Sequence, residues 1–203
     1  AVAGDGRGET NFDAIAAQLP DLLVTTAGVG FIEEDSPLRD IAPVVVIPFD
    51  APWRDQIADT GAIFDRVEQA ETVVAVLDAE LAELAAAVES DPTSLSIVMS
   101  VFGQLASLGQ TTAASALVRE AGIERPEPQT AAEAIDGAPG FSPFSEELLT
   151  EHDAEFLVVL DGVFYDSDVV EAFPTDQQLE AVLSGNAGLV DGDLWFAAHP
   201  FSL

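Results

Sequence analysis

An arginine flanked by glycines and several aromatic residues placed after predicted strands carry the clearest binding chemistry in this sequence. Arg7 stands in "GDGRGET", where the glycines allow close approach of the backbone. Its guanidinium offers several N–H donors in a fixed fork, which suits carboxylate and other oxygen acceptors. The aromatic candidates for packing against the apolar part of a ligand are Phe31, Phe141, Tyr165 and Phe201. The alternative is a solvated arginine and four core aromatics.

Other chemistries find little support in the sequence. Cysteine is absent, which excludes thiolate metal sites and cysteine nucleophiles. The two histidines are far apart: we expect His152 at the surface of a polar helix end and His199 at the mouth of a strand. No G-x-S-x-G elbow or phosphate-cradling loop occurs. The sequence therefore predicts neither an enzyme nor a metal protein.

Acidic residues dominate the charge of the chain. The 203 residues hold 37 acidic and 6 basic side chains, a formal net charge of −31, and every basic residue is an arginine. Such a chain repels nucleic acid and anionic lipid surfaces, which bind through basic patches. We interpret the acids as a heavily solvated surface, as in a salt-adapted or acidic secreted protein. An acidic patch for a basic partner or a cation is the alternative.

The first block of the chain, residues 11–49, alternates helix and strand. "NFDAIAAQLPDLLVTT" predicts a helix that stops at Pro20 and passes directly into a strand over 21–26. "VVVIP" at 44–48 is typical of a strand buried on both faces of a parallel sheet. Residues 1–10 are small and polar, so we expect no signal peptide there and interpret the chain as a mature or trimmed segment.

The middle of the chain predicts one long helix over 53–89. Apolar residues recur along it at intervals of three, four and seven, and an unbroken helix would reach about 55 Å. We expect any break at Gly61, and prefer a spine between two lobes to a coiled coil.

The last block, 95–203, repeats the helix–strand order of the first. We predict strands at 95–102 and within 145–162, a helix closed by Gly122, a helix over 175–185 and a last strand at 192–198. The glycine-containing stretch 103–111 predicts a loop, and 124–144, with four prolines, an irregular crossover. Met99 and Trp195 are expected in the core.

Several of these stretches carry a family resemblance. "NFDAIAAQLPDLLVTT" resembles the "N-L-E-x-I-x-x-L-x-P-D-L" helix–strand of the helical-backbone (class III) periplasmic binding proteins, which serve importers of ferric siderophores, haem and cobalamin. "LRDIAPVVVI", "LVREAGIERP", "FSEELLTEHDAEFLVVLDG" and "AGLVDGDLWFAAHP" are similar to later parts of the same pattern, in the same order. Relative to that pattern, the usual first strands and last helix are missing.

The resemblance implies an α/β fold of two lobes joined by a long spine helix, with a ligand cleft between the lobes. It divides the chain into a partial N-terminal lobe at 1–52, a linking helix at 53–90 and a C-terminal lobe at 91–203. The implied function is delivery of a ferric siderophore to an ABC importer permease by a monomeric, extracytoplasmic, periplasmic or lipid-anchored protein without an intrinsic cofactor. The alternatives are haem or cobalamin binding, or a metal- or cofactor-binding protein on a similar two-lobed fold.

The resemblance also implies roles for individual residues. Arg7 occupies a position similar to a ligand-binding arginine of hydroxamate-siderophore members. Each lobe of such proteins offers an acidic side chain to the permease, and the matching candidates are Glu33 or Glu34 in "FIEEDSP" and Glu146 in "FSEELL". Capping of a helix is the alternative role for these acids. Because the chain is strongly acidic, we favour a neutral or cationic ferric hydroxamate over an anionic ferric catecholate.

Overall fold

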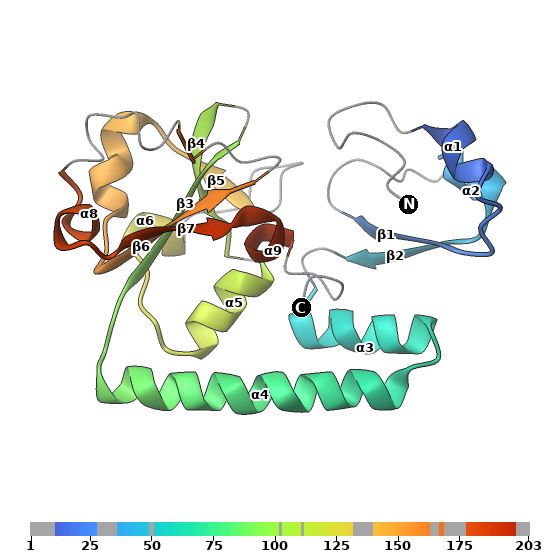
Figure 1. Ribbon diagram of the computed structural model, residues 1–203, viewed down its shortest axis with the longest axis horizontal. Helices are drawn as coiled ribbons and strands as arrows, with labels where there is room; N and C mark the ends of the chain where they lie inside the picture. Colours follow the sequence, from blue (N-terminus) through green and yellow to red (C-terminus); the bar gives the residue numbers. More distant parts are fainter. Residues whose placement is uncertain are drawn as a thin grey trace. The chain divides into compact units, whose positions relative to one another are not determined.

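The computed structural model describes residues 11–27, 36–48, 51–101, 103–110, 112–131, 140–162, 167–168 and 178–197 (Figure 1). The chain divides into two compact units, Ala1–Phe49 and Asp50–Leu203. Both units combine helices with parallel strands, which confirms the predicted α/β class. None of the described helices has the length and apolarity that a membrane crossing requires.

The first unit alternates helix and strand as the sequence predicts. Its elements are α1 (Phe12–Ala16), β1 (Leu23–Ala27), α2 (Leu38–Ile41) and β2 (Val44–Pro48). The Asn11 side chain accepts a hydrogen bond from the Ala14 N–H at 2.9 Å and so caps α1. The two strands pair in parallel, with Leu23 opposite Val44, which confirms the parallel pairing expected of the β-branched run.

The predicted spine is a pair of helices, α3 (Trp53–Ile63) and α4 (Val67–Ser90). The chain turns at 64–66, where Asp65 has a φ of 53°, and not at Gly61 as predicted. Gly61 lies inside α3, at a position where a Cβ would come within 2.5 Å of the Cβ of Ala70. The glycine therefore lets the two helices approach closely. The 24 residues of α4 span about 36 Å, so the single rod predicted for 53–89 is wrong.

A five-stranded sheet forms the centre of the second unit. Its strands are β3 (Leu95–Val101), β4 (Gln104–Leu108), β5 (Phe141–Pro143), β6 (Phe156–Asp161) and β7 (Ala187–Asp191), in the order β5-β4-β3-β6-β7. Strands β3, β6 and β7 run parallel, whereas β4 is antiparallel to both of its neighbours.

Strand β4 occupies a stretch for which the sequence predicts a loop. Gly103, with a φ of 76°, makes the tight turn from β3 into β4. Four of the five β4 residues are buried, so no alternation of polar and apolar residues marks the strand. Its Ala106 and Ser107 are buried but small, so the strand lacks the β-branched and aromatic side chains that usually identify one.

Helices cover both faces of this sheet (Figure 1). One face packs Ile97, Met99 and Leu160 against α5 (Ala113–Glu120) and α9 (Gly192–Ala197). The other packs Val98 and Leu157 against the 3₁₀ helix η1 (Glu146–His152) and α8 (Glu180–Ser184). Met99 is fully buried and Trp195 packs against the first cluster, as predicted for both.

Two further predictions for this unit are wrong. Residues 192–197 form helix α9 instead of a last strand, because the strand ends at Asp191, whose Oδ1 accepts the Leu194 N–H at 3.2 Å and starts the helix. The segment 124–144, predicted as irregular, holds the short helix α6 (Glu127–Ala131) as well as β5.

Candidate functional site

The carboxyl ends of three parallel strands meet at one edge of the second unit's sheet. We call this the carboxyl edge and define it by Val101, Asp161 and Asp191, the last residues of β3, β6 and β7. Ligands of open α/β sheets bind outside such ends, so this edge is the candidate site.

Two carboxylates distinguish the carboxyl edge. Asp161 and Asp191 are paired in register on adjacent strands, and both are exposed. Asp161 Oδ1 accepts a hydrogen bond from the Ser167 hydroxyl at 2.9 Å, while Asp191 caps α9. Two neighbouring negative charges repel an anionic ligand and favour a neutral or cationic one.

Most of the predicted site residues lie outside the described part of the chain. They are the ligand candidates Arg7, Phe31, Tyr165 and Phe201 and the docking candidates Glu33 and Glu34. Their roles remain predictions from the sequence.

Phe141 lies in strand β5 and not in the predicted loop. It pairs with Leu108, the last residue of β4, while Gln104 at the other end of β4 pairs with Val101. The backbone of Phe141 is therefore at the end of the sheet opposite the carboxyl edge. A three-residue strand that ends in proline gives no periodic signal, which is why the sequence did not predict it.

Glu146 begins η1 on the side of the carboxyl edge. The preceding Phe144 donates its N–H to the Leu105 carbonyl at 3.0 Å, near the end of β4 that faces Val101. Glu146 is partly exposed. The neighbouring Glu147 has a lowered pKa because its own backbone N–H and the Ser145 hydroxyl bond its carboxylate. The position is compatible with a docking role, which remains a prediction.

His152 is buried, so its predicted surface position is wrong. Only 5% of the residue is exposed, and its ring stacks on Phe144 at a centroid distance of 3.8 Å. The three-residue repeat of a 3₁₀ helix places it on the same side as the buried Leu149. Burial, and secondarily the charge of Arg125, lowers the pKa of His152 to about 4.

A buried polar network that was not predicted from the sequence surrounds His152. The Gln129 amide oxygen accepts from the Ile97 N–H at 3.2 Å and from Arg125 Nη2 at 2.7 Å. Its amide nitrogen lies 2.8 Å from Ser96 Oγ and 3.3 Å from His152 Nδ1. Because the oxygen already has two donors, the nitrogen donates to Nδ1, which makes His152 the neutral tautomer protonated on Nε2. The spacing of four between Arg125 and Gln129 was the only available signal.

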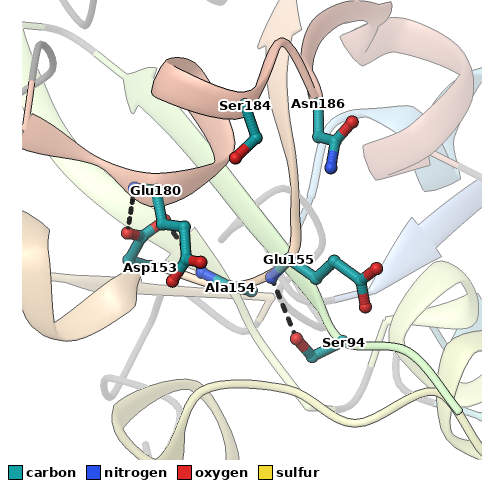
Figure 2. A pocket seen from close by; sticks show the side chains of 7 residues that line it. All are labelled: Ser94, Asp153, Ala154, Glu155, Glu180, Ser184 and Asn186. Carbon is teal, nitrogen blue, oxygen red and sulfur yellow. Dashed lines mark hydrogen bonds between the residues drawn. The ribbon is translucent and has the colours of Figure 1, made fainter.

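A cavity of about 560 Å³ opens near the starts of β3, β6 and β7, away from the carboxyl edge (Figure 2). It is lined by Ser94, Asp153, Ala154, Glu155, Glu180, Ser184 and Asn186.

The polar groups of this cavity bond mainly to one another. The Asp153 carboxylate accepts the backbone N–H groups of Glu180 and Ala181 and so caps α8, and Ser94 Oγ accepts the Glu155 N–H at 3.0 Å. Across the described ranges, no three acidic or histidine side chains gather as metal ligands. We interpret the cavity as a by-product of loop packing, and the carboxyl edge remains the candidate site.

A comparison with the sequence models of known protein families identifies the family of this chain. Residues 1–186 match the sequence model of the family described as periplasmic binding protein. The chain belongs to that family. A periplasmic binding protein holds a substrate for transport, in agreement with the absence of catalytic motifs noted from the sequence. No curated protein sequence matches the chain.

Solved structures of similar fold cover almost the whole of this periplasmic binding protein. Staphylococcus aureus FhuD2 with bound ferrioxamine B is 16% identical with a TM-score of 0.76, over 96% of this chain and 76% of that one. The siderophore periplasmic binding protein from the fuscachelin gene cluster of Thermobifida fusca is 22% identical with a TM-score of 0.70, over 96% and 74%. A Bacillus subtilis FhuD-fold protein, described as a component of a ferrichrome ABC transporter, is 19% identical with a TM-score of 0.73, over 97% and 74%.

Proposed function

We propose that this periplasmic binding protein binds a ferric siderophore outside the cytoplasm and presents it to the permease of an ABC importer. The observation that carries the proposal is the family match over residues 1–186, together with structural neighbours whose names include siderophore-binding proteins. The ligand is an iron chelate taken up as cargo, and the chain acts as a carrier.

The charge of the protein favours a hydroxamate siderophore. An anionic ferric catecholate would approach a chain of net charge −31 against its electrostatic field. At the carboxyl edge it would also meet Asp161 and Asp191. A neutral or cationic ferric hydroxamate meets neither barrier.

Trp195 is a natural reporter for the ligand class. It lies in α9, four residues after Asp191 at the carboxyl edge, and is half-buried, whereas Trp53 is 3% exposed in α3. Trp53→Phe leaves Trp195 as the single tryptophan. We expect ferrioxamine B to change its fluorescence saturably and a ferric tris-catecholate to bind far more weakly.

The same fluorescence titration is repeated with haem and with cobalamin. Tight catecholate binding without a hydroxamate response would overturn the charge argument. Saturable binding of haem or cobalamin alone would overturn the siderophore assignment.

Arg7 is our candidate for the contact with ligand oxygens. Arg7→Ala should weaken binding by roughly 1.5–3 kcal/mol, the usual value of a hydrogen bond to a charged group. Arg39→Ala, at an exposed position of α2, is the matched control and should bind normally. Unaltered affinity of the Arg7 variant would mean that Arg7 is only a solvated charge.

Docking to the permease is assigned to Glu33 or Glu34 in the first unit and to Glu146 in the second. Combining Glu34→Arg with Glu146→Arg should abolish transport and leave ligand affinity intact. Glu151→Arg, at an exposed position near the other end of η1, is the control for a charge reversal on the same element. Normal uptake by the double variant would refute the docking assignment.

A further inference from the structure

A second cavity of the second unit, about 430 Å³, lies beside the end of α5. Its polar lining comes from Gln110, Ser115, Arg119, Glu124, Arg125 and Thr130. The Glu124 carbonyl accepts the Leu95 N–H at 2.9 Å at the start of β3, so the cavity is at the opposite end of the sheet from the carboxyl edge. The proposed siderophore site does not include it.

Arg125 lines this cavity and, among the described residues, has no acidic partner. Its guanidinium donates to Ser115 Oγ at 2.8 Å, to the Leu108 carbonyl at 2.9 Å and to Gln129 Oε1, all of them neutral. Its Nε is buried and has no hydrogen-bond partner. In the part of the chain that the structure describes, the ion pairs all belong to Arg54.

A partly buried cation surrounded by neutral partners is unfavourable without a counter-charge. Burial lowers the pKa of Arg125 to about 10, in line with the free-energy cost of removing its charge from water. An anion bound in the cavity would supply the counter-charge and so lower this free-energy cost.

Arg119 adds a second positive charge to the same cavity. Its side chain is exposed and donates to the Gln110 carbonyl at 3.5 Å, a weak contact. The chain has six basic residues against 37 acidic ones, so two of its six cations gather here. Glu124, the carboxylate in the lining, is exposed and leaves the cavity with an excess of positive charge.

We propose that this cavity binds a small oxyanion, a phosphate or a carboxylate ion, between Arg119 and Arg125. Guanidinium groups match such oxygens through charge-assisted, often paired hydrogen bonds. The Gln110 side chain and the Thr130 hydroxyl already donate to backbone carbonyls, so the two arginines supply the specificity. The bound anion stabilises the second unit by giving Arg125 a counter-charge that none of the described residues supplies.

The small number of cations makes the site directly observable. With six arginines and no lysine, the ¹H–¹⁵N spectrum of the side chains holds six arginine Nε–H signals. Inorganic phosphate and acetate are titrated at constant ionic strength with sodium chloride as the balancing salt, because a chain of charge −31 responds to any electrolyte. We expect the Arg119 and Arg125 signals to shift along one saturable curve while the other four stay in place.

Variants assign the signals and test the site. Arg119→Gln should weaken phosphate binding roughly tenfold, the value of one lost charged hydrogen bond. Arg66→Gln, at an exposed position before α4, should bind phosphate like the wild type. Arg125→Gln would also remove hydrogen bonds inside the second unit and could change its fold. Arg119→Gln is therefore the variant that tests the proposal.

The comparison of phosphate with acetate tells which oxyanion the cavity prefers. Shifts of all six signals, no saturation, or equal affinity in wild type and Arg119→Gln would each overturn the proposal.

Discussion

The two ends of the second unit's sheet are built in opposite ways. At the carboxyl edge two strands finish in exposed carboxylates, Asp161 and Asp191, which accept hydrogen bonds from the Ser167 hydroxyl and the Leu194 N–H. At the other end, Gln129 joins β3 and η1 through three buried hydrogen bonds and Arg125 through a fourth, partly buried one. The hydrogen bonds at one end join distant segments, whereas the other end exposes two carboxylates to solvent.

This difference separates stability from binding. Side chains that connect distant segments inside the protein are costly to remove, because each leaves buried partners unsatisfied. Exposed groups with local bonds can change with little effect on the fold. We therefore expect substitutions at the carboxyl edge to destabilise the sheet less than substitutions at the opposite end.

The largest effect should follow loss of Gln129. Gln129→Leu leaves the Ile97 N–H, the Ser96 hydroxyl and Arg125 Nη2 without their buried partner. We expect the free energy of unfolding to fall by about 3–5 kcal/mol, measured by urea denaturation with tryptophan fluorescence. Gln69→Leu, at an exposed position of α4, is the control and should change stability by less than about 0.5 kcal/mol. Equal stability of the two variants would refute the contrast between the ends.

Acid should weaken the same end through His152. The pKa of this histidine is 6.5 when unperturbed and about 4 in the folded protein, so between these values the unfolded chain binds more protons. The stability due to neutral His152 is complete above pH 6.5 and is lost as pH falls towards 4, at up to about 1.4 kcal/mol per pH unit.

The measurement compares wild type with His152→Leu at several pH values, which cancels the titration of the many carboxylates. The stability difference between the two proteins should shift by about 3 kcal/mol in favour of the variant between pH 7 and 4. Arg125 is the charged group that contributes to the shift, and it stays charged throughout this range. Parallel stability curves would mean that His152 titrates normally.

The carboxyl edge should tolerate change better. Asp191→Ala removes the cap of α9 and should cost about 1 kcal/mol, whereas Asp191→Asn keeps an acceptor for the Leu194 N–H and should cost less. Urea denaturation gives the stability, and amide exchange at Leu194 gives the local effect. A loss as large as that of Gln129→Leu would show that this edge is also structural.

Substitution of Arg54 should change stability least, although Arg54 forms ion pairs with two carboxylates. It bonds Asp78 through Nε at 2.9 Å and Glu120 through Nη1 at 2.9 Å, and its pKa is raised mainly by the hydrogen bond to Asp78. The side chain is 38% exposed, so solvent and salt screen these pairs. Arg54→Gln should cost less than about 1 kcal/mol at low salt and nearly nothing in 1 M sodium chloride. A cost that persists at high salt would point to packing of Arg54 over the Trp53 ring instead.

Local patterns explain which parts of the fold the sequence predicted. "VVVIP" predicted the bounds of β2, because a β-branched run carries its own strand signal, although the three valines are only partly buried in the two-stranded sheet. The break after α3 was predicted at the wrong residue. Gly61 allows close packing against Ala70, and a glycine with that role cannot be distinguished in the sequence from a glycine that ends a helix. Strand β4 was missed because burial on both faces removes alternation.

The candidate site was less accessible to prediction than the fold. The carboxyl edge follows from strand order, which the alternation of helix and strand implies. The position of Phe141 depends on pairing with Leu108, and the burial of His152 depends on Gln129, which is 23 residues away. Such contacts are decided by tertiary structure and leave no periodic mark in the sequence.

The Gln129 side chain also has a consequence for self-association. Strand β4 pairs with β3 only from Val98 onwards, so within the described ranges the first residues of β3 have no strand beside them on that side. The Glu124 carbonyl accepts the Leu95 N–H and the Gln129 amide accepts the Ile97 N–H, which occupies the backbone donors that a foreign strand would use. Unpaired strand edges of this kind recruit other chains into aggregates. One glutamine and one carbonyl thus keep a central strand from acting as a template, and loss of that cover would make misassembly depend on protein concentration.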